Sequence, residues 1–233
     1  MTTERFYPVS EQALLIEFGQ APSEEIRLAI RQFTEELDQH RFPWLVEYIP
    51  AFTNVTLLFD LQYFRDERDP HAVIEEEVSL ILSAKQSDTH SKAIHTVKIP
   101  VCYDEEFGMD LDEVAAHNGI SKEEVIEIHT SGHYPVYMIG FSPGFPYLGG
   151  MSEKIAAPRK EKPRPKIPAG SVGIAGTQTG VYPMETPGGW QIIGRTPLRL
   201  FDAEQNPPAL LKAGDSVEFY AISKEEYDRL KES

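Results

Sequence analysis

From Tyr134 onward, glycine and proline recur so often that no helical period persists. Short apolar runs alternate with these residues, as expected for strands separated by tight turns. The runs are residues 136–141, 170–175, 189–194, 198–201 and 216–222. Many short strands with Gly/Pro turns are typical of a closed or nearly closed antiparallel barrel. The sequence therefore predicts a mainly β C-terminal domain.

The first 85 residues show a different pattern, in which strands and helices follow a regular order. The expected strands are residues 5–9, 13–18, 45–50 and 54–60. Ser23 can cap a helix that ends near His40, and Pro70 stands at the first position of a second helix. The order strand–strand–helix–strand–strand–helix predicts a small α+β domain with both helices on one face of its sheet.

Residues 86–92 contain no large apolar side chain and predict a linker. The predicted domains are therefore residues 1–85, a small α+β domain, and residues 93–233, the barrel domain. Two short helices are expected early in the second domain from capping-box patterns, Asp110 with Glu113 and Ser121 with Glu124.

The charge of the chain restricts its partners. A formal net charge of −15 argues against nucleic acid, because neutralising phosphates requires a basic face. No apolar run approaches the roughly 18 residues that a membrane helix needs, and the first residues do not resemble a signal peptide. Cys102 is the single cysteine and lies in an apolar stretch, so we expect a buried structural thiol. These features predict a cytoplasmic protein without a membrane partner.

Residues 154–199 reverse the sign of the overall charge and form a cationic segment. The segment contains only two acidic residues, Glu161 and Glu185. Its eight basic residues are Lys154, Arg159, Lys160, Lys162, Arg164, Lys166, Arg195 and Arg199. A cationic island on an acidic protein can concentrate a small anion such as a carboxylate or phosphate. The alternative is a loop whose charges are simply solvated, and composition does not decide between the two.

Residues 140–144 fit the G-x-S-x-G pattern of a hydrolase nucleophile elbow, but three features exclude that interpretation. The elbow uses the backbone N–H after the serine, and Pro143 has none. It also leads into a helix, which Pro143 and Pro146 oppose. Finally, every histidine precedes Ser142, whereas the fold requires a histidine after it.

Metal and nucleotide sites have little support in the sequence. His129 and His133 stand four residues apart, but Gly132 and Pro135 interrupt a helix there, and no paired cysteines accompany them. The glycines at 170, 173, 176 and 180 match neither a dinucleotide fingerprint nor a P-loop. We expect no metal site, and any nucleotide site must be unconventional or lie on another chain.

The segment 137–197 is unusually dense in rigid, aromatic and glycine residues. Prolines fix φ, and glycines let backbone N–H groups approach a ligand closely. Aromatic walls with a few polar groups suit a cleft for a small ligand. The candidate binding residues are Tyr137, Phe141, Pro143, Gly144, Phe145, Tyr147, Pro168, Gly170, Ser171, Pro187, Gly188, Gly189 and Trp190. The alternative is a turn-rich barrel in which these residues only shape corners.

The same segment resembles a known family. The motifs are residues 140–150 (GFSPGFPYLGG), the Pro-Arg pairs at 158–159 and 163–164, residues 167–175 (IPAGSVGIA), residues 182–190 (YPMETPGGW) and residues 193–197 (IGRTP). They are similar to the allophanate hydrolase subunit 1 family, and length and two-part layout are most similar to its KipI/PxpB group. The resemblance implies a cyclophilin-like barrel for the second domain, without prolyl isomerase activity.

Resemblance to this group implies an enzyme subunit. The implied complex is an ATP-dependent 5-oxoprolinase that opens 5-oxo-L-proline, a lactam with a carboxylate, to L-glutamate. It implies two partners, a larger PxpC/KipA-like subunit of homologous fold and a third, PxpA/LamB-YcsF-like subunit, and little activity without them. ATP is implied as a co-substrate, and the sequence does not locate its site.

The implied substrate suggests roles for four residues. Arg159 or Arg164 could hold the carboxylate in bidentate fashion. Gln178 and Tyr182 could hydrogen-bond the lactam or a phosphorylated intermediate. We therefore predict Arg159, Arg164, Gln178 and Tyr182 as the catalytic group.

Two other functions remain open. The KipI name is associated with inhibition of a sporulation sensor histidine kinase, and an exposed aromatic patch could dock on such a partner. A component of a urea or allophanate pathway is a third interpretation, ranked lower because those relatives are often fused to much larger chains.

Overall fold

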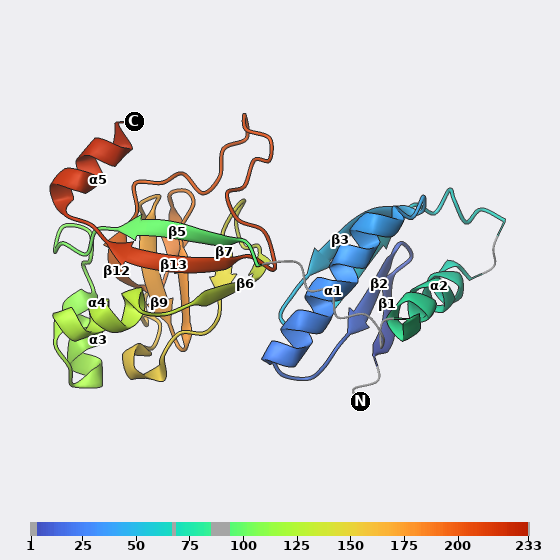
Figure 1. Cartoon of the computed structure of the whole chain (residues 1–233), viewed down its shortest axis with the longest axis horizontal. Helices are drawn as coiled ribbons and strands as arrows, with labels where there is room; N and C mark the ends of the chain where they lie inside the picture. The colour runs from blue at the N-terminus through green and yellow to red at the C-terminus, as the bar shows by residue number, and fades with distance from the viewer. Residues whose placement is uncertain (1–3, 67–68, 85–93, 233) are drawn as a thin grey trace. The chain divides into compact units, whose positions relative to one another are not determined.

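The computed structural model describes residues 4–66, 69–84 and 94–232, and the chain divides into two compact units, residues 1–93 and 94–233 (Figure 1). The expected linker, residues 86–92, lies outside the described residues. None of the described helices has the length and apolar content needed to cross a membrane.

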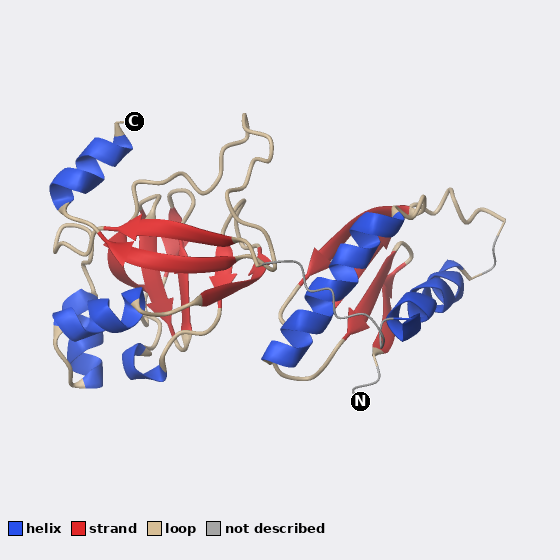
Figure 2. Cartoon of the chain, viewed as in Figure 1, coloured by secondary structure: helices blue, strands red, loops and turns tan. Residues whose placement is uncertain are grey.

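The first unit is a four-stranded antiparallel sheet with two helices (Figure 2). Its elements are β1 (Arg5–Ser10), β2 (Ala13–Glu17), α1 (Glu24–His40), β3 (Leu45–Pro50), β4 (Asn54–Phe59) and α2 (Pro70–Ala84). The strand order is β1-β2-β4-β3. Ile16 of β2 and Leu57 of β4 share one core with Phe33 of α1 and Val78 of α2. Both helices therefore cover the same sheet face, and the predicted α+β arrangement is confirmed.

The second unit contains nine strands, three α-helices and one 3₁₀ helix within residues 94–232. They are β5 (Thr96–Val101), α3 (Leu111–Asn118), α4 (Lys122–Thr130), β6 (Tyr134–Ile139), β7 (Pro146–Leu148), η2 (Glu153–Ile155), β8 (Arg164–Ile167), β9 (Ser171–Ala175), β10 (Gln178–Val181), β11 (Thr186–Gly188), β12 (Gln191–Arg195), β13 (Ser216–Ala221) and α5 (Lys224–Lys231).

Seven of these strands form a barrel in the order β12-β9-β10-β7-β6-β13-β5. The two ends of the sheet meet where Cys102 and Arg195 exchange two backbone hydrogen bonds, each 2.9 Å long. Closure removes the exposed strand edges that an open sheet would present. The predicted β-barrel is therefore confirmed, and Cys102 is buried in a separate small cluster with Phe107, Ile222 and Tyr227.

Two details differ from the sequence-based expectation. β5 and β13 are parallel along six residue pairs, so the barrel is not purely antiparallel. The rest of the barrel lies between them in sequence, and a long connection allows either direction, unlike a tight hairpin. Residues 198–201 do not form a strand; the segment contributes a single bridge between Phe201 and Ala209.

The strands around β9 have two differently packed faces. Val172 and Ile174 point into the barrel core, whereas Ala175 belongs to a second cluster on the outer face. The outer face is covered by the β8–β11 ribbon, the two-stranded antiparallel sheet of β8 and β11. Ile167 of this ribbon is fully buried against the outer cluster. The ribbon and the outer barrel face therefore enclose a small core of their own.

The two short helices begin differently. Ser121 and Glu124 form the expected capping box of α4, with both side-chain bonds present. The capping box expected for α3 is wrong, because Asp110 makes no side-chain cap bond. Its carboxylate instead binds residues that are remote in sequence, and this contact belongs to the site described next.

Candidate functional site

Five of the predicted aromatic residues gather in one aromatic cluster: Phe141, Phe145, Tyr147, Tyr182 and Trp190. Phe145 lies at its centre, with ring centroids 5.4 Å from Phe141, 5.1 Å from Tyr147, 5.4 Å from Tyr182 and 5.6 Å from Trp190. All four contacts are edge-to-face, the arrangement in which the positive edge of one ring meets the negative face of another.

The cluster is closed inside and open at one rim. Phe145, Tyr182 and Trp190 are buried, with exposed fractions of 2%, 1% and 5%, whereas Phe141 is 64% exposed. Burial raises the pKa of Tyr182 to about 12, although the Trp190 backbone hydrogen bond opposes that shift. Tyr182 is therefore a neutral phenol near pH 7. The surface that a ligand can reach lies at the rim, beside Phe141.

Phe141 stands on a strained turn. Its φ is +68°, and the Ser142 N–H donates to the Gly140 carbonyl at 2.8 Å, which defines a γ-turn of the rare positive-φ kind. Backbone strain of this sort is concentrated at functional sites. The strand β7, not a helix, follows this turn, and the Ser142 hydroxyl oxygen is buried without a hydrogen-bond partner in the described part of the chain. The structure therefore agrees with excluding a nucleophile elbow.

Arg159 lies beside a different ring of the cluster, that of Trp190. Its guanidinium carbon is 5.9 Å from the Trp190 ring centroid, within the range of a cation–π contact. The residue is exposed, and it forms no ion pair with any residue described in the two units. Its charge is therefore available to an external anion.

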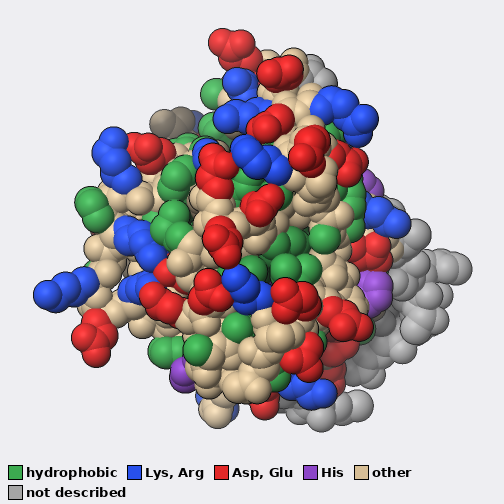
Figure 3. All heavy atoms as spheres, turned by 90° about the vertical axis from the view of Figure 1, so that its left-hand side faces the viewer, with side chains coloured by type: hydrophobic (Ala, Val, Ile, Leu, Met, Phe, Trp, Pro, Cys, Tyr) green, Lys and Arg blue, Asp and Glu red, His purple; other side chains and the backbone are tan. Residues whose placement is uncertain are grey.

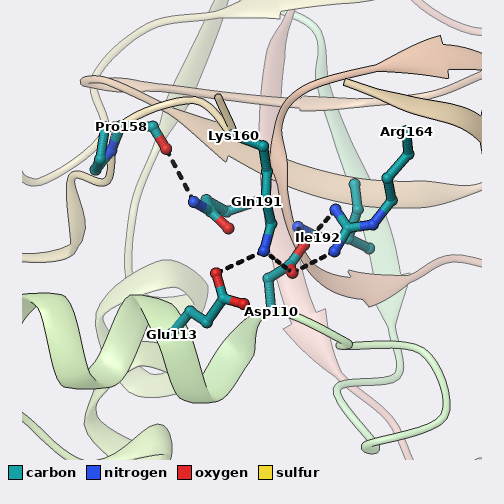
Figure 4. Close-up of polar contacts among 7 residues, drawn as sticks. All are labelled: Asp110, Glu113, Pro158, Lys160, Arg164, Gln191 and Ile192. Carbon is teal, nitrogen blue, oxygen red and sulfur yellow. Dashed lines mark hydrogen bonds and ion pairs between the residues drawn. The ribbon is translucent and has the colours of Figure 1, made fainter. Parts of the chain in front are cut away.

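Arg164 and Lys160 have a different arrangement, because both bind the buried carboxylate of Asp110 (Figure 4). Arg164 donates through two nitrogens, at 2.9 and 2.5 Å, and the Lys160 ammonium lies 2.8 Å from Oδ1. Lys160 also pairs with Glu113 at 2.5 Å. The Ile192 N–H donates to the same Asp110 carboxylate at 2.6 Å.

These donors control the protonation of Asp110. Burial alone raises the pKa of a carboxyl group, but the hydrogen bonds from Arg164, Lys160 and the Ile192 backbone outweigh it and lower the pKa below its usual value. Asp110 is therefore ionised at neutral pH. Its negative charge neutralises neighbouring cations inside the fold.

Ion pairing also reduces the cationic segment predicted from the sequence. Lys166 pairs with Glu185 at 3.0 Å and Arg199 with Asp202 at 3.6 Å, in addition to the pairs of Lys160 and Arg164. Acidic and basic side chains are interspersed on the face of the molecule in Figure 3. The segment therefore does not act as one uniform island, and Arg159 is distinguished by its position over Trp190.

The other predicted residues occupy three places. Gln178 is at the turn end of β10, on the same side of the strand as Gly180 and Tyr182 by strand alternation. Backbone groups of Gly170 and Ser171 hold Tyr182 through bonds of 2.7 and 2.9 Å. The remainder shape turns or the ribbon: Tyr137 on β6, Pro143 and Gly144 after the γ-turn, Pro168 before β9, Pro187 and Gly188 on β11, and Gly189 after it.

Gly188 is required by close packing inside the ribbon. A Cβ atom there would lie 2.4 Å from the Tyr182 hydroxyl and 2.7 Å from the Ile167 Cδ1. We expect Gly188→Ala to lower the free energy of unfolding by about 1–3 kcal/mol through overpacking. Gly189→Ala is the matched control, because its nearest contact would be an ordinary 3.5 Å. Equal stability of the two variants in urea denaturation would contradict this prediction.

Sequence reasoning missed Gln191 and misassigned Asp110. The spacing of Asp110 and Glu113 favoured a helix cap. The actual partners of Asp110, Lys160 and Arg164, are remote in sequence. Gln191 donates from Nε2 to the Pro158 carbonyl at 3.0 Å, and its Oε1 is buried with no partner among the described residues. No local motif identifies either contact.

Within the described ranges, no group of three or more His, Cys, Asp or Glu side chains could hold a metal ion. His129 is a fully buried core residue of α4. Its ring nitrogens lie 2.7 Å from the Tyr103 hydroxyl and 2.9 Å from the Thr179 hydroxyl. His129 therefore packs in the core with both of its ring nitrogens in hydrogen bonds.

The chain is similar in sequence and structure to proteins that are already known. Residues 4–211 match the family described as carboxyltransferase domain, subdomain C and D. The B-type subunit of 5-oxoprolinase from Bacillus subtilis (strain 168) is 48% identical over 229 residues, covering 96% of this chain and 95% of that protein. The protein of the same name from Escherichia coli O157:H7 is 39% identical over 220 residues, covering 94% and 96%. The crystal structure of TTHA0988 superposes with a TM-score of 0.77 at 33% identity; the match covers 91% of this chain but only 40% of that one.

Proposed function

The chain belongs to the carboxyltransferase subdomain C and D family, and we propose that it is the B-type subunit of an ATP-dependent 5-oxoprolinase, which hydrolyses 5-oxo-L-proline to L-glutamate. Identity of 48% and 39% over nearly the whole length of proteins with that name supports the proposal. We also propose that it works in the cytoplasm.

The observation that carries a substrate role is the exposed guanidinium of Arg159 over Trp190, at 5.9 Å from the ring centroid. 5-Oxo-L-proline carries a carboxylate at neutral pH, and a planar guanidinium can bind a carboxylate through two parallel hydrogen bonds. Within the same cluster, the 64% exposed ring of Phe141 offers apolar surface to a lactam ring, whereas Trp190 is buried. Arg164 is a weaker proposal for the same role, because Asp110 already occupies its guanidinium.

Tyr182 and Gln178 remain proposed donors to the lactam or to a phosphorylated intermediate. A phenol whose pKa is about 12 can donate a hydrogen bond at neutral pH but cannot act as a base. Tyr182 is only 1% exposed, so a substrate could reach its hydroxyl only if the β8–β11 ribbon moved. A base or acid supplied by another subunit is therefore part of this proposal.

We propose that ATP is a co-substrate of the complex; the sequence contains no P-loop, so its site is either unconventional or on another subunit. A larger partner of related fold, PxpC/KipA-like, and a third subunit, PxpA/LamB-YcsF-like, complete the proposed complex. The TTHA0988 chain, of which this protein matches 40%, supports the idea that such a sequence works next to a larger partner segment. Phosphate release that depends on ATP and 5-oxo-L-proline should appear with all three subunits and be lost when this chain is omitted.

Arg159→Gln is expected to raise the KM for 5-oxo-L-proline by about 10–100-fold, because a hydrogen bond between charged groups contributes about 1.5–3 kcal/mol. Lys162→Gln is the matched control, since Lys162 is a nearby exposed cation of the same segment. Steady-state phosphate release in the reconstituted complex measures both. An Arg159→Gln complex with the KM of the unmodified protein would rule out the carboxylate assignment.

Inhibition of a sensor histidine kinase is a second candidate, favoured by the 64% exposed ring of Phe141. Exposed aromatic side chains on rigid turns are common anchors of protein interfaces. Phe141→Ala should then weaken inhibition of kinase autophosphorylation by the purified chain. Absence of any inhibition by the unmodified chain would remove this candidate.

A further inference from the structure

Arg159 lies in a strap, residues 158–160, that runs beside the start of β12. The strap is held at its first residue, where Gln191 Nε2 donates to the Pro158 carbonyl at 3.0 Å. It is held at its last residue, where the Lys160 N–H donates to the Gly189 carbonyl at 2.7 Å. Arg159 therefore stands between two anchored neighbours, and its backbone has little freedom.

The side chain of Lys160 adds a second anchor to the strap. Its ammonium lies 2.8 Å from Asp110, whose side chain is only 1% exposed. The same carboxylate binds Arg164, the first residue of β8, and the Ile192 N–H of β12. Figure 4 shows these groups converging on Asp110 from separate parts of the chain. One buried carboxylate thus joins the strap, the ribbon and the barrel wall.

Asp110 also determines which cation is available. The charges of Lys160 and Arg164 are balanced by Asp110 and Glu113, so this group of four has no net charge. Arg159 is next to Lys160 in the sequence, but it has no such counterion among the residues that the structure describes. An anion that approaches Arg159 would therefore meet one uncompensated guanidinium rather than three competing cations.

Gln191 has an arrangement that packing alone does not explain. It is 8% exposed, and its Oε1 is buried without a hydrogen-bond partner in the described ranges. A buried unsatisfied acceptor is unfavourable, and an apolar side chain of similar length would avoid it. The only hydrogen bond described for this amide is the one that fixes Pro158. The one hydrogen bond that the structure describes for this side chain therefore holds the strap.

We propose that Gln191 and Asp110 are positioning residues for the substrate carboxylate. Gln191 fixes the backbone before Arg159, and Asp110 fixes Lys160 after it, so that the guanidinium stays over Trp190 where the carboxylate would bind. This inference rests on the proposed function, since it concerns the same site.

The test uses Gln191→Met in the full chain, because methionine keeps the length of the side chain but cannot donate to the Pro158 carbonyl. Gln205→Met, in an exposed loop, is the matched control. Hydrogen exchange followed by mass spectrometry reports the Lys160 amide and hence the strap. In the reconstituted complex we expect Gln191→Met to raise the KM for 5-oxo-L-proline about 10-fold while kcat changes less than about 2-fold.

Support requires faster exchange of the strap in Gln191→Met, with a KM shifted in the same direction as in Arg159→Gln. Asp110→Asn should raise KM in the same way, and Gln191→Met keeps the proposal testable if that variant does not fold. Unchanged exchange, or a normal KM in Gln191→Met when Arg159→Gln raises KM, would overturn the positioning role. A normal KM in Arg159→Gln would instead show that the carboxylate assignment itself fails.

Discussion

Asp110→Ala is expected to lower the free energy of unfolding of the second unit by about 3–5 kcal/mol, because it leaves buried or half-buried cations without their counterion. Arg164 loses two hydrogen bonds and Lys160 loses one ion pair, while the Ile192 N–H loses its acceptor. For a unit of this size the melting temperature should fall by about 10 °C or more. Thermal and urea denaturation followed by circular dichroism measure the change.

Asp112→Ala is the matched control for this prediction. Asp112 lies two residues further on, in α3, and its ion pair with Lys122, at 3.1 Å, is on the surface with a 76% exposed carboxylate. Surface pairs of this kind contribute about 0–1 kcal/mol. If both variants lost the same stability, Asp110 would be an ordinary surface carboxylate in energetic terms, and its proposed role in holding the strap would lose its basis.

A second comparison separates charge from packing. Replacing Asp110, Lys160 and Arg164 together by apolar residues of similar size removes the group without leaving any of its charges buried and unpaired. Such replacements are often neutral or stabilising. We therefore expect the triple variant to recover much of the stability lost in Asp110→Ala while losing activity. This outcome would indicate that the network is retained for the site rather than for the fold.

The sign of the pH effect follows from the lowered pKa of Asp110. A carboxylate whose pKa is lower in the folded state stabilises the protein above the unfolded value, about 3.9, and loses that contribution as the pH falls through the folded value. The difference between Asp110→Ala and the unmodified chain should therefore be constant from about pH 5 to pH 8. It should shrink only in stronger acid.

Local patterns predicted the order of elements well, because each depends on nearby residues. Ser23 illustrates this, since its side chain accepts from the Ile26 N–H at 3.2 Å at the start of α1, as its position suggested. Gly/Pro spacing likewise predicted the barrel. The parallel pairing of β5 with β13 was not predictable, because these strands are separated by most of the domain and no turn chemistry links them.

The candidate site was predictable only in part for the same reason. Density of aromatic residues in one segment indicated a cluster, and the rings do meet around Phe145. Whether each ring is buried or exposed depends on the ribbon that covers them, and a sequence does not show that cover. Asp110 had a helix-cap pattern within four residues, whereas its real partner Arg164 is 54 positions away. Local spacing favoured the wrong partner.

His129 is expected to make the second unit sensitive to mild acid. Burial lowers the pKa of its imidazole from 6.5 to about 3, so the folded protein holds it neutral. The unfolded chain binds a proton below about pH 6.5, which the folded state does not, and stability therefore falls as pH decreases. At about 1.4 kcal/mol per pH unit, lowering the pH from 7 to 5 should remove about 2 kcal/mol. Urea denaturation at a series of pH values measures this slope.

His129→Gln should flatten that slope, because glutamine does not titrate, even though the variant is less stable at pH 7. The expected starting loss arises from the contacts of the ring, which stacks on Phe219 with centroids 4.5 Å apart and bonds to Tyr103 and Thr179. His117→Gln is the control, since His117 is exposed and its replacement should leave the slope unchanged. A slope between pH 7 and pH 5 that persists in His129→Gln would mean that another group titrates there. The imidazole of His129 would then bind a proton as readily in the folded protein as in the unfolded chain, and its burial would not contribute to the pH dependence of stability.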